Sequence, residues 1–268
     1  MTPDPKDRPR AGCPRNRIGH LWVDAVTFEG TLSAIEALVR AGKGGSVFTP
    51  NVDHVVTAED DPAFRVAYDA VSLSLPDGKP ILWAGRLLGT PFPEKVSGSD
   101  LIEPLLRMAG RLGWRVFLLG GAPGVAEAAA ERSRKDFGVN VVGTASPFIR
   151  LDGAPGDLDQ AIEEVAAARP DLVLVAMGAP KQERWIHHNR ARLGGAVGVG
   201  IGASLDFVIG RIQRAPRWVS NAGLEWLYRL VREPRRLARR YLVKDPRFLA
   251  VLVRTSRIPR ADRVTTRP

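Results

Sequence analysis

Short apolar runs alternate along this chain with longer amphipathic segments, beginning near residue 20. Some runs, such as Val116-Phe117-Leu118-Leu119, contain no polar residue, which is typical of strands buried on both faces. The segments between them have apolar residues at helical spacing. The predicted strands are Leu21–Val23, Ser46–Phe48, Val71–Leu75, Arg115–Leu119, Asn140–Val142, Leu172–Ala176 and Ala196–Ile201. The predicted helices cover about 31–41, 52–70, 79–88, 99–112, 124–136, 157–168 and 181–193.

This strand–helix alternation predicts a Rossmann-like α/β fold, with a mostly parallel sheet and helices on both faces. Residues 1–17 are rich in Pro and Arg and have no apolar periodicity, so we expect a disordered lead there. The α/β core is expected over 18–210. Beyond it, Leu224, Leu227 and Val231 form an apolar helical stripe, and residues 211–268 are interpreted as an amphipathic helical appendage.

The net charge of +10 is concentrated in that appendage. Residues 211–268 contain 16 Lys and Arg against four acids, whereas residues 1–210 contain 23 basic and 25 acidic residues. A nearly neutral body with a basic tail indicates that the tail meets a polyanion or an anionic membrane.

Composition excludes several classes of protein. A single cysteine, Cys13, allows neither a disulfide framework nor a multi-thiolate metal site. No uncharged stretch exceeds thirteen residues, and a spanning helix needs about 20 apolar residues. Residues 1–20 lack the apolar region of a signal peptide. We therefore expect a cytoplasmic protein.

Candidate chemistry lies directly after the predicted strands. In open parallel sheets, ligands bind beyond the carboxyl ends of the strands. The segments there contain two carboxylates, two amides and several glycines, an arrangement typical of an active site. They are Thr49-Pro50-Asn51, Pro76-Asp77-Gly78, Gly120-Gly121-Ala122-Pro123-Gly124, residues 177–183 and residues 202–206.

Two of these segments predict anion binding at a helix N-terminus. In the first, Gly120 and Gly121 open a glycine-rich turn before a helix, although such a turn also serves tight strand–helix packing alone. The second, Gly178-Ala179-Pro180-Lys181-Gln182-Glu183, puts Pro180 in a first helical turn, with Lys181 and Gln182 beside a diphosphate or its sugar. The alternative interpretation of this second segment is a charged first helical turn that is exposed to solvent.

Asp77 also has two interpretations. Pro-Asp-Gly is an ordinary β-turn sequence, in which the Asp side chain bonds its own backbone. However, this turn ends an apolar strand on the same edge as Asn51 and Gln182. A carboxylate there is a candidate general base for a sugar hydroxyl.

The histidines give no sign of metal chemistry. His20, His54, His187 and His188 lack the spacing of a zinc site, and no Ser/His/Asp arrangement stands out. We expect no catalytic metal, no cofactor and no covalent triad.

Read in order, these segments resemble the WecG/TagA/CpsF family of bacterial glycosyltransferases over roughly residues 20–250. The residues that carry the resemblance are Thr49-Pro50-Asn51, Leu75-Pro76-Asp77-Gly78, Val96-Ser97-Gly98-Ser99-Asp100-Leu101, Val116-Phe117-Leu118-Leu119-Gly120-Gly121, Met177-Gly178-Ala179-Pro180-Lys181-Gln182-Glu183, Val199-Gly200-Ile201-Gly202-Ala203, Arg214-Ala215-Pro216-Arg217-Trp218, Leu224-Glu225-Trp226-Leu227-Tyr228-Arg229-Leu230 and Glu233-Pro234-Arg235-Arg236.

The resemblance implies metal-independent, inverting transfer of a hexose-type residue, such as N-acetylmannosamine, from a UDP-sugar to a sugar on a polyprenyl diphosphate. It implies work at the cytoplasmic membrane face in polysaccharide assembly, with the appendage docked on the membrane. Asp77 matches the family's base, and Thr49, Asn51 and Gln182 match sugar or acceptor contacts.

Other substrate-binding residues follow from matched motifs or from their place near the edge. Lys95 stands where the resemblance leads us to expect an arginine, and Asp206 matches an acid near the uracil. The remaining candidates are Gly120, Gly121, Gly178, Pro180, Lys181, Glu183, Gly202, Arg211, Arg214 and Arg217. Lysine, arginine and helix N-termini would stabilise a leaving diphosphate without Mg²⁺.

Two other function classes stay open. One is a Rossmann-type nucleotide enzyme of other chemistry, although the dinucleotide fingerprint is missing. The other is a nucleic-acid-binding protein, because aromatic residues such as Trp218 and Tyr241 interleave with tail arginines. We favour no nucleic acid, since clustered Asp, Asn and Gln would then have no role. A homo-oligomer is possible.

Overall fold

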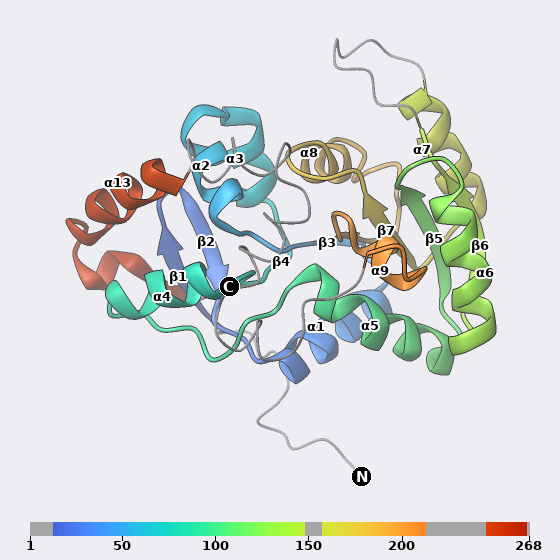
Figure 1. Cartoon of the computed structure of the whole chain (residues 1–268), viewed down its shortest axis with the longest axis horizontal. Helices are drawn as coiled ribbons and strands as arrows, with labels where there is room; N and C mark the ends of the chain where they lie inside the picture. The colour runs from blue at the N-terminus through green and yellow to red at the C-terminus, as the bar shows by residue number, and fades with distance from the viewer. Residues whose placement is uncertain (1–12, 148–156, 213–244, 267–268) are drawn as a thin grey trace.

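The computed structural model describes residues 13–147, 157–212 and 245–266. Its main sheet has the strand order β4-β3-β8-β7-β5-β6, and every neighbouring pair is parallel (Figure 1). The strands are β3 (Gly45–Phe48), β4 (Leu73–Ser74), β5 (Arg115–Gly120), β6 (Asn140–Ala145), β7 (Leu172–Ala176) and β8 (Val197–Gly200). Each overlaps a run predicted from the sequence, and the Rossmann-like α/β fold is confirmed.

Helices cover both faces of this sheet. Phe117 and Leu119 of β5 belong to one apolar cluster, with α2, α3, α4, α7 and α8, while Val116 and Leu118 belong to a second, with α1, α5, α6 and α9. The helices are α1 (Phe28–Ala41), α2 (Val52–Asp60), α3 (Pro62–Asp69), α4 (Lys79–Leu87), α5 (Gly98–Leu112), α6 (Val125–Phe137), α7 (Asp157–Ala168), α8 (Lys181–His188) and α9 (Ser204–Val208). The uninterrupted apolar runs are therefore buried from both sides.

Two predicted helices have different limits in the structure. The segment expected as one helix over 52–70 is divided at Asp61, which ends α2 and caps α3 by accepting a hydrogen bond from the Phe64 N–H at 3.0 Å. Pro62 cannot donate to the preceding turn, so the helix restarts there. The helix expected over 181–193 ends at His188.

A second, antiparallel sheet has the order β2-β1-β9, from β2 (Leu21–Asp24), β1 (Pro14–Ile18) and β9 (Val264–Thr266). The prediction of a disordered lead is thus wrong for its last residues. Polar and charged residues form most of β1, so hydrophobic periodicity could not reveal it. Its Arg15 lies 3.4 Å from Asp24, whose other oxygen accepts the Ser74 N–H of the main sheet at 2.6 Å.

The last part of the segment expected as an appendage lies against the body. Helix α13 (Asp245–Ser256) packs on α2 and β1, and the 3₁₀ helix η3 (Arg260–Arg263) leads into β9 (Figure 1). Phe248, Val251 and Leu252 are buried in the first apolar cluster. The Thr255 hydroxyl accepts the Gly19 N–H at 3.0 Å. Among the described residues, no helix is both long and apolar enough to cross a membrane.

Candidate active site

The loops after β3, β4, β8 and β7 meet at one edge of the main sheet, here called the carboxyl edge, because these four strands are neighbours and parallel. Asp77 follows β4 and is half-buried. Its backbone N–H donates to the Pro50 carbonyl at 3.0 Å, and the Val96 N–H donates to the Pro76 carbonyl at 2.9 Å. The Asp77 loop is therefore bound to the loop of Thr49 and Asn51 and to the segment that contains Lys95.

The loop after β3 presents one buried and one half-buried polar side chain. Thr49 is buried, whereas Asn51 is half-buried and caps α2. The Asn51 Oδ1 accepts the Asp53 N–H at 3.0 Å and lies 2.9 Å from His54 Nδ1. The cap fixes the amide where the chain leaves the sheet.

The side chains of Gln182 and Glu183 are buried below the surface of the edge. Gln182 is 2% exposed, and both ends of its amide bind the protein: Oε1 accepts the Gly202 N–H at 2.9 Å, and Nε2 donates to Glu183 Oε1 at 2.7 Å. Glu183 is fully buried, and its Oε1 lies 3.3 Å from His54 Nε2. In this structure both side chains bind protein groups, whereas we had expected them to contact substrate.

Two residues near Glu183, namely His54 and Tyr68, were not among the predicted site residues. His54, which we considered only as a metal ligand, lies between Asn51 and Glu183. Burial, Glu183 and Asp77 together raise the pKa of Tyr68 well above its usual value of 10, so its hydroxyl stays protonated. The position of His54 three residues after Asn51 is a capping spacing that could have signalled its role.

The glycine-rich turns have different structural reasons. At Gly120, φ is 101°, and a Cβ there would lie 2.6 Å from the Ala176 carbonyl oxygen, so the close approach of β5 and β7 alone requires glycine. Gly121 has φ of 88° and a Cβ there would contact Val125. At Gly178, φ is 73° and no atom would contact a Cβ, so packing does not explain this glycine.

In the described part of the chain, four helices begin after strands of the main sheet without a side-chain cap: α4 after Gly78, α6 after Gly124, α8 after Pro180 and the five-residue α9 after Ala203. The positive ends of the α4, α6 and α8 dipoles favour an anion. Some of the first N–H groups already donate to backbone carbonyls, as Val125 does to Ala122 and as Lys181 and Gln182 do to Gly178. Pro180, preceded by a cis peptide bond, stands just before α8, and Lys181 is the first residue of that helix and half-buried. The sequence analysis predicted anion binding at the N-termini of α6 and α8 but not at the N-terminus of α4.

The remaining charged candidates have mutual partners. Lys95 Nζ lies 2.8 Å from Asp100 Oδ2, which also accepts the Ser97 hydroxyl at 2.6 Å. Asp206 is half-buried in α9, 3.8 Å from the exposed Arg211. Arg214 and Arg217 lie outside the described residues.

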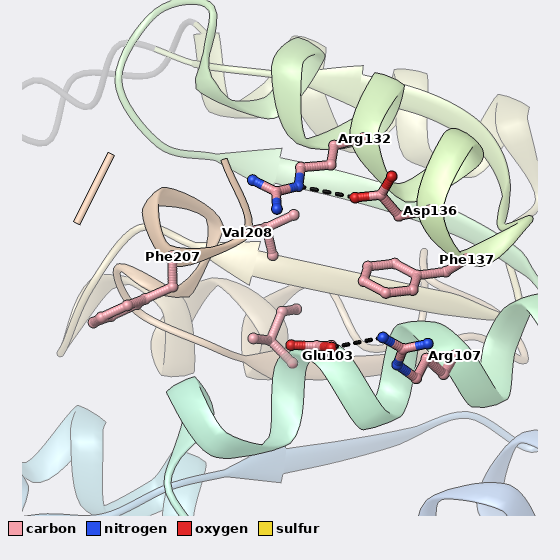
Figure 2. Close-up of a pocket in the computed structure, with 8 residues that line it drawn as sticks. Glu103, Arg107, Arg132, Asp136, Phe137, Phe207 and Val208 are labelled. Carbon is pink, nitrogen blue, oxygen red and sulfur yellow. Dashed lines mark hydrogen bonds and ion pairs between the residues drawn. The ribbon is translucent and has the colours of Figure 1, made fainter. Parts of the chain in front are cut away.

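A pocket of about 360 Å³ lies between α5, α6 and α9, but none of the predicted site residues lines it. Figure 2 shows its charged side chains in two ion pairs, Glu103 with Arg107 and Arg132 with Asp136. Because these charges neutralise one another, the pocket offers no unpaired group for chemistry. Within the described ranges, no three His, Cys, Asp or Glu side chains are grouped so that they could hold a metal ion.

Comparison with known proteins identifies the family of this chain. The model of the glycosyl transferase WecG/TagA/CpsF family matches residues 16–262. A curated relative from Bacillus spizizenii is 32% identical over 216 residues, which cover 80% of this chain and 81% of the relative. That relative is named N-acetylglucosaminyldiphosphoundecaprenol N-acetyl-beta-D-mannosaminyltransferase.

Proposed function

Because the chain belongs to the WecG/TagA/CpsF family and is a glycosyltransferase, we propose that it moves a hexose-type sugar from a UDP-sugar to a sugar on a polyprenyl diphosphate. The product would enter cell-surface polysaccharide synthesis. The name of the relative, which contains both a diphosphoundecaprenol acceptor and a mannosaminyl group, supports N-acetylmannosamine as the first donor to test. The observation that carries the proposal is the half-buried Asp77 at the carboxyl edge, where α4, α6 and α8 also begin without a side-chain cap.

In the proposed reaction, Asp77 accepts the proton of an acceptor hydroxyl while that oxygen attacks the anomeric carbon. The new C–O bond forms as the bond from the anomeric carbon to the diphosphate breaks, and UDP leaves with the electron pair. A single displacement of this kind inverts the anomeric configuration. Thr49 and Asn51 are proposed to contact the sugars.

The leaving diphosphate is proposed to be stabilised by protein groups. The positive dipole ends of α4, α6 and α8, together with the Lys181 ammonium, are proposed to supply positive charge where the negative charge develops. We propose that Lys95, Arg211, Arg214 and Arg217 add to it. This chemistry has no step that needs a metal ion, so added EDTA should leave the rate unchanged.

A UDP-release assay tests the proposed function. The full chain is incubated with a panel of UDP-sugars and an N-acetylglucosaminyl prenyl diphosphate, and UDP is measured with and without acceptor. We expect acceptor-dependent UDP release with one donor, most readily UDP-N-acetylmannosamine. Binding of a nicotinamide cofactor, without UDP release from any donor, would instead favour a nucleotide enzyme of other chemistry.

We also propose that the protein binds the inner face of the membrane as a peripheral protein, partly through α4. This helix begins two residues after Asp77, and its Trp83 and Leu87 are 50% and 76% exposed. Arg86, also exposed, lies between them on the same side of the helix. An apolar pair with a cation suits an anionic lipid surface, and it would bring lipid close to the base.

Replacing Trp83 and Leu87 together by serine should weaken binding to anionic vesicles by roughly tenfold or more, because each side chain loses apolar burial in lipid. Co-sedimentation with phosphatidylglycerol vesicles measures the effect. Leu112→Ser is the matched control, since Leu112 is exposed at the end of α5, just before β5 begins. Equal binding of both variants would mean that α4 does not contact the lipid surface. Tight binding to nucleic acid and none to vesicles would mean that the protein binds nucleic acid rather than the membrane.

A further inference from the structure

A buried series of polar side chains joins three loops of the carboxyl edge. It begins at Asn51 after β3, continues through His54 of α2 to Glu183 of α8, and ends through Gln182 on the backbone N–H of Gly202 after β8. The successive distances are 2.9, 3.3, 2.7 and 2.9 Å. Since β8 lies between β3 and β7, the series extends across the end of the central strand.

Glu183 is the centre of this series. Its Oε1 accepts from Gln182 and faces His54, while its Oε2 is buried without a partner among the described residues. A fully buried carboxylate with one unsatisfied oxygen is costly. Burial also keeps it away from any substrate in this structure. Its contacts therefore act on its neighbours rather than on a ligand.

Those neighbours are parts of the active site. Through His54 the carboxylate is linked to Asn51, whose Oδ1 and backbone N lie 2.9 and 3.4 Å from His54 Nδ1, and through Gln182 it is linked to the loop of Gly202. Packing enforces the second contact, because a Cβ at Gly200 would lie 2.9 Å from Gln182 Nε2. The amide of Gln182 fits there only because β8 ends in glycine.

We propose that Glu183 and His54 are positioning residues, which set the Asn51 amide and the Gly202 loop at the correct separation for transfer. This inference rests on the proposed function and assigns Glu183 a role other than substrate contact. A misplacement of about 1 Å can reduce an enzymatic rate by about a hundredfold. The effect should thus fall on kcat more than on KM for the UDP-sugar.

The test compares Glu183→Ala with the conservative Glu183→Gln in the full chain. The alanine variant should lose about 10- to 100-fold in kcat, with KM for the UDP-sugar changed by about threefold or less. The glutamine variant should stay within about threefold of the unmodified protein, because its carbonyl oxygen can still accept from His54 and Gln182. Adding His54→Gln to Glu183→Ala should cost little more, since both act through one contact.

Thr255→Ala is the matched control for destabilisation, because Thr255 is buried and hydrogen-bonded but lies on α13, away from the edge. It should lower Tm without lowering kcat at a temperature where the variant is folded. A rate loss in Thr255→Ala equal to that in Glu183→Ala, or an unchanged rate in Glu183→Ala, would overturn the inference.

A second readout is independent of turnover. In ¹⁵N NMR spectra, Glu183→Ala should shift the His54 ring signals and the Gly202 amide, whereas Thr255→Ala should not. Unmoved signals would also overturn the inference. If the unmodified protein releases no UDP with any donor and acceptor, the proposed function fails, while the spectra still decide whether Glu183 fixes the two loops.

Discussion

Asp77→Asn is expected to lower kcat by about 10²- to 10⁴-fold, the range that a general base contributes. The amide keeps the size of the side chain but cannot accept the proton of the acceptor hydroxyl. Because the backbone contact of Asp77 with Pro50 does not involve the carboxylate, the loop should keep its place. KM for the UDP-sugar should change little.

Single-turnover assays and titration with the UDP-sugar separate the two quantities. Asp69→Asn is a charge-matched control, because Asp69 is exposed at the end of α3. It should keep the rate of the unmodified protein. A rate for Asp77→Asn within about threefold of normal would exclude this carboxylate as the base, and the reaction would need another proton acceptor.

Leu252→Ala is expected to lower the free energy of unfolding by about 2–4 kcal/mol, as a large-to-small substitution in a core does. Leu252 of α13 is 6% exposed and packs in the same apolar cluster as the main-sheet residues Phe117 and Val173. The C-terminal helix should therefore unfold together with the body rather than separately.

Leu249→Ala offers a close comparison, because Leu249 is on the same helix and is 64% exposed. Its effect should stay within about 0.5 kcal/mol. Urea titration followed by circular dichroism measures both variants, and one cooperative transition is expected for each. Equal effects, or a separate early transition for Leu252→Ala, would mean that α13 is not part of the core.

This packing also affects how membrane binding is studied. A truncation from residue 211 would remove α13 and β9 as well as any basic surface, so it would expose the apolar cluster that Phe248 and Val251 cover. Loss of activity in such a variant would not distinguish the loss of basic surface from the exposure of the apolar cluster. Point substitutions on the exposed face of α4 avoid that ambiguity.

The main sheet could be predicted because its strands are apolar without interruption. Runs such as Leu172–Ala176 are apolar at every position, and this pattern is typical of strands covered by helices on both sides. Of the small sheet, only β2 was predicted, as Leu21–Val23, and neither its two partner strands nor their pairing was. The pairing of Arg15 with Thr265 joins distant polar residues, and nothing local in either segment specifies the partner.

The sequence predicted which residues lie near the carboxyl edge but not which of them are buried. The rule that ligands bind beyond strand ends led to Asp77 and Asn51, which the structure brings together through Pro50. It could not show that Gln182 and Glu183 are buried, because burial depends on side chains from other elements. Gln182 fits because Gly200 has no side chain, and the buried Glu183 lies beside His54 from another helix.

The pairing of β1 with β9 has a consequence for biosynthesis. Most of the printed sequence separates Pro14 from its partner Thr266, so Pro14 leaves the ribosome well before Thr266 does. Until β9 is synthesised, the edge of β1 opposite β2 has unpaired backbone N–H and C=O groups, which could pair with another strand. Completion of this sheet thus waits until β9 has been synthesised, and a nascent chain that stalls before that point would be exposed to aggregation.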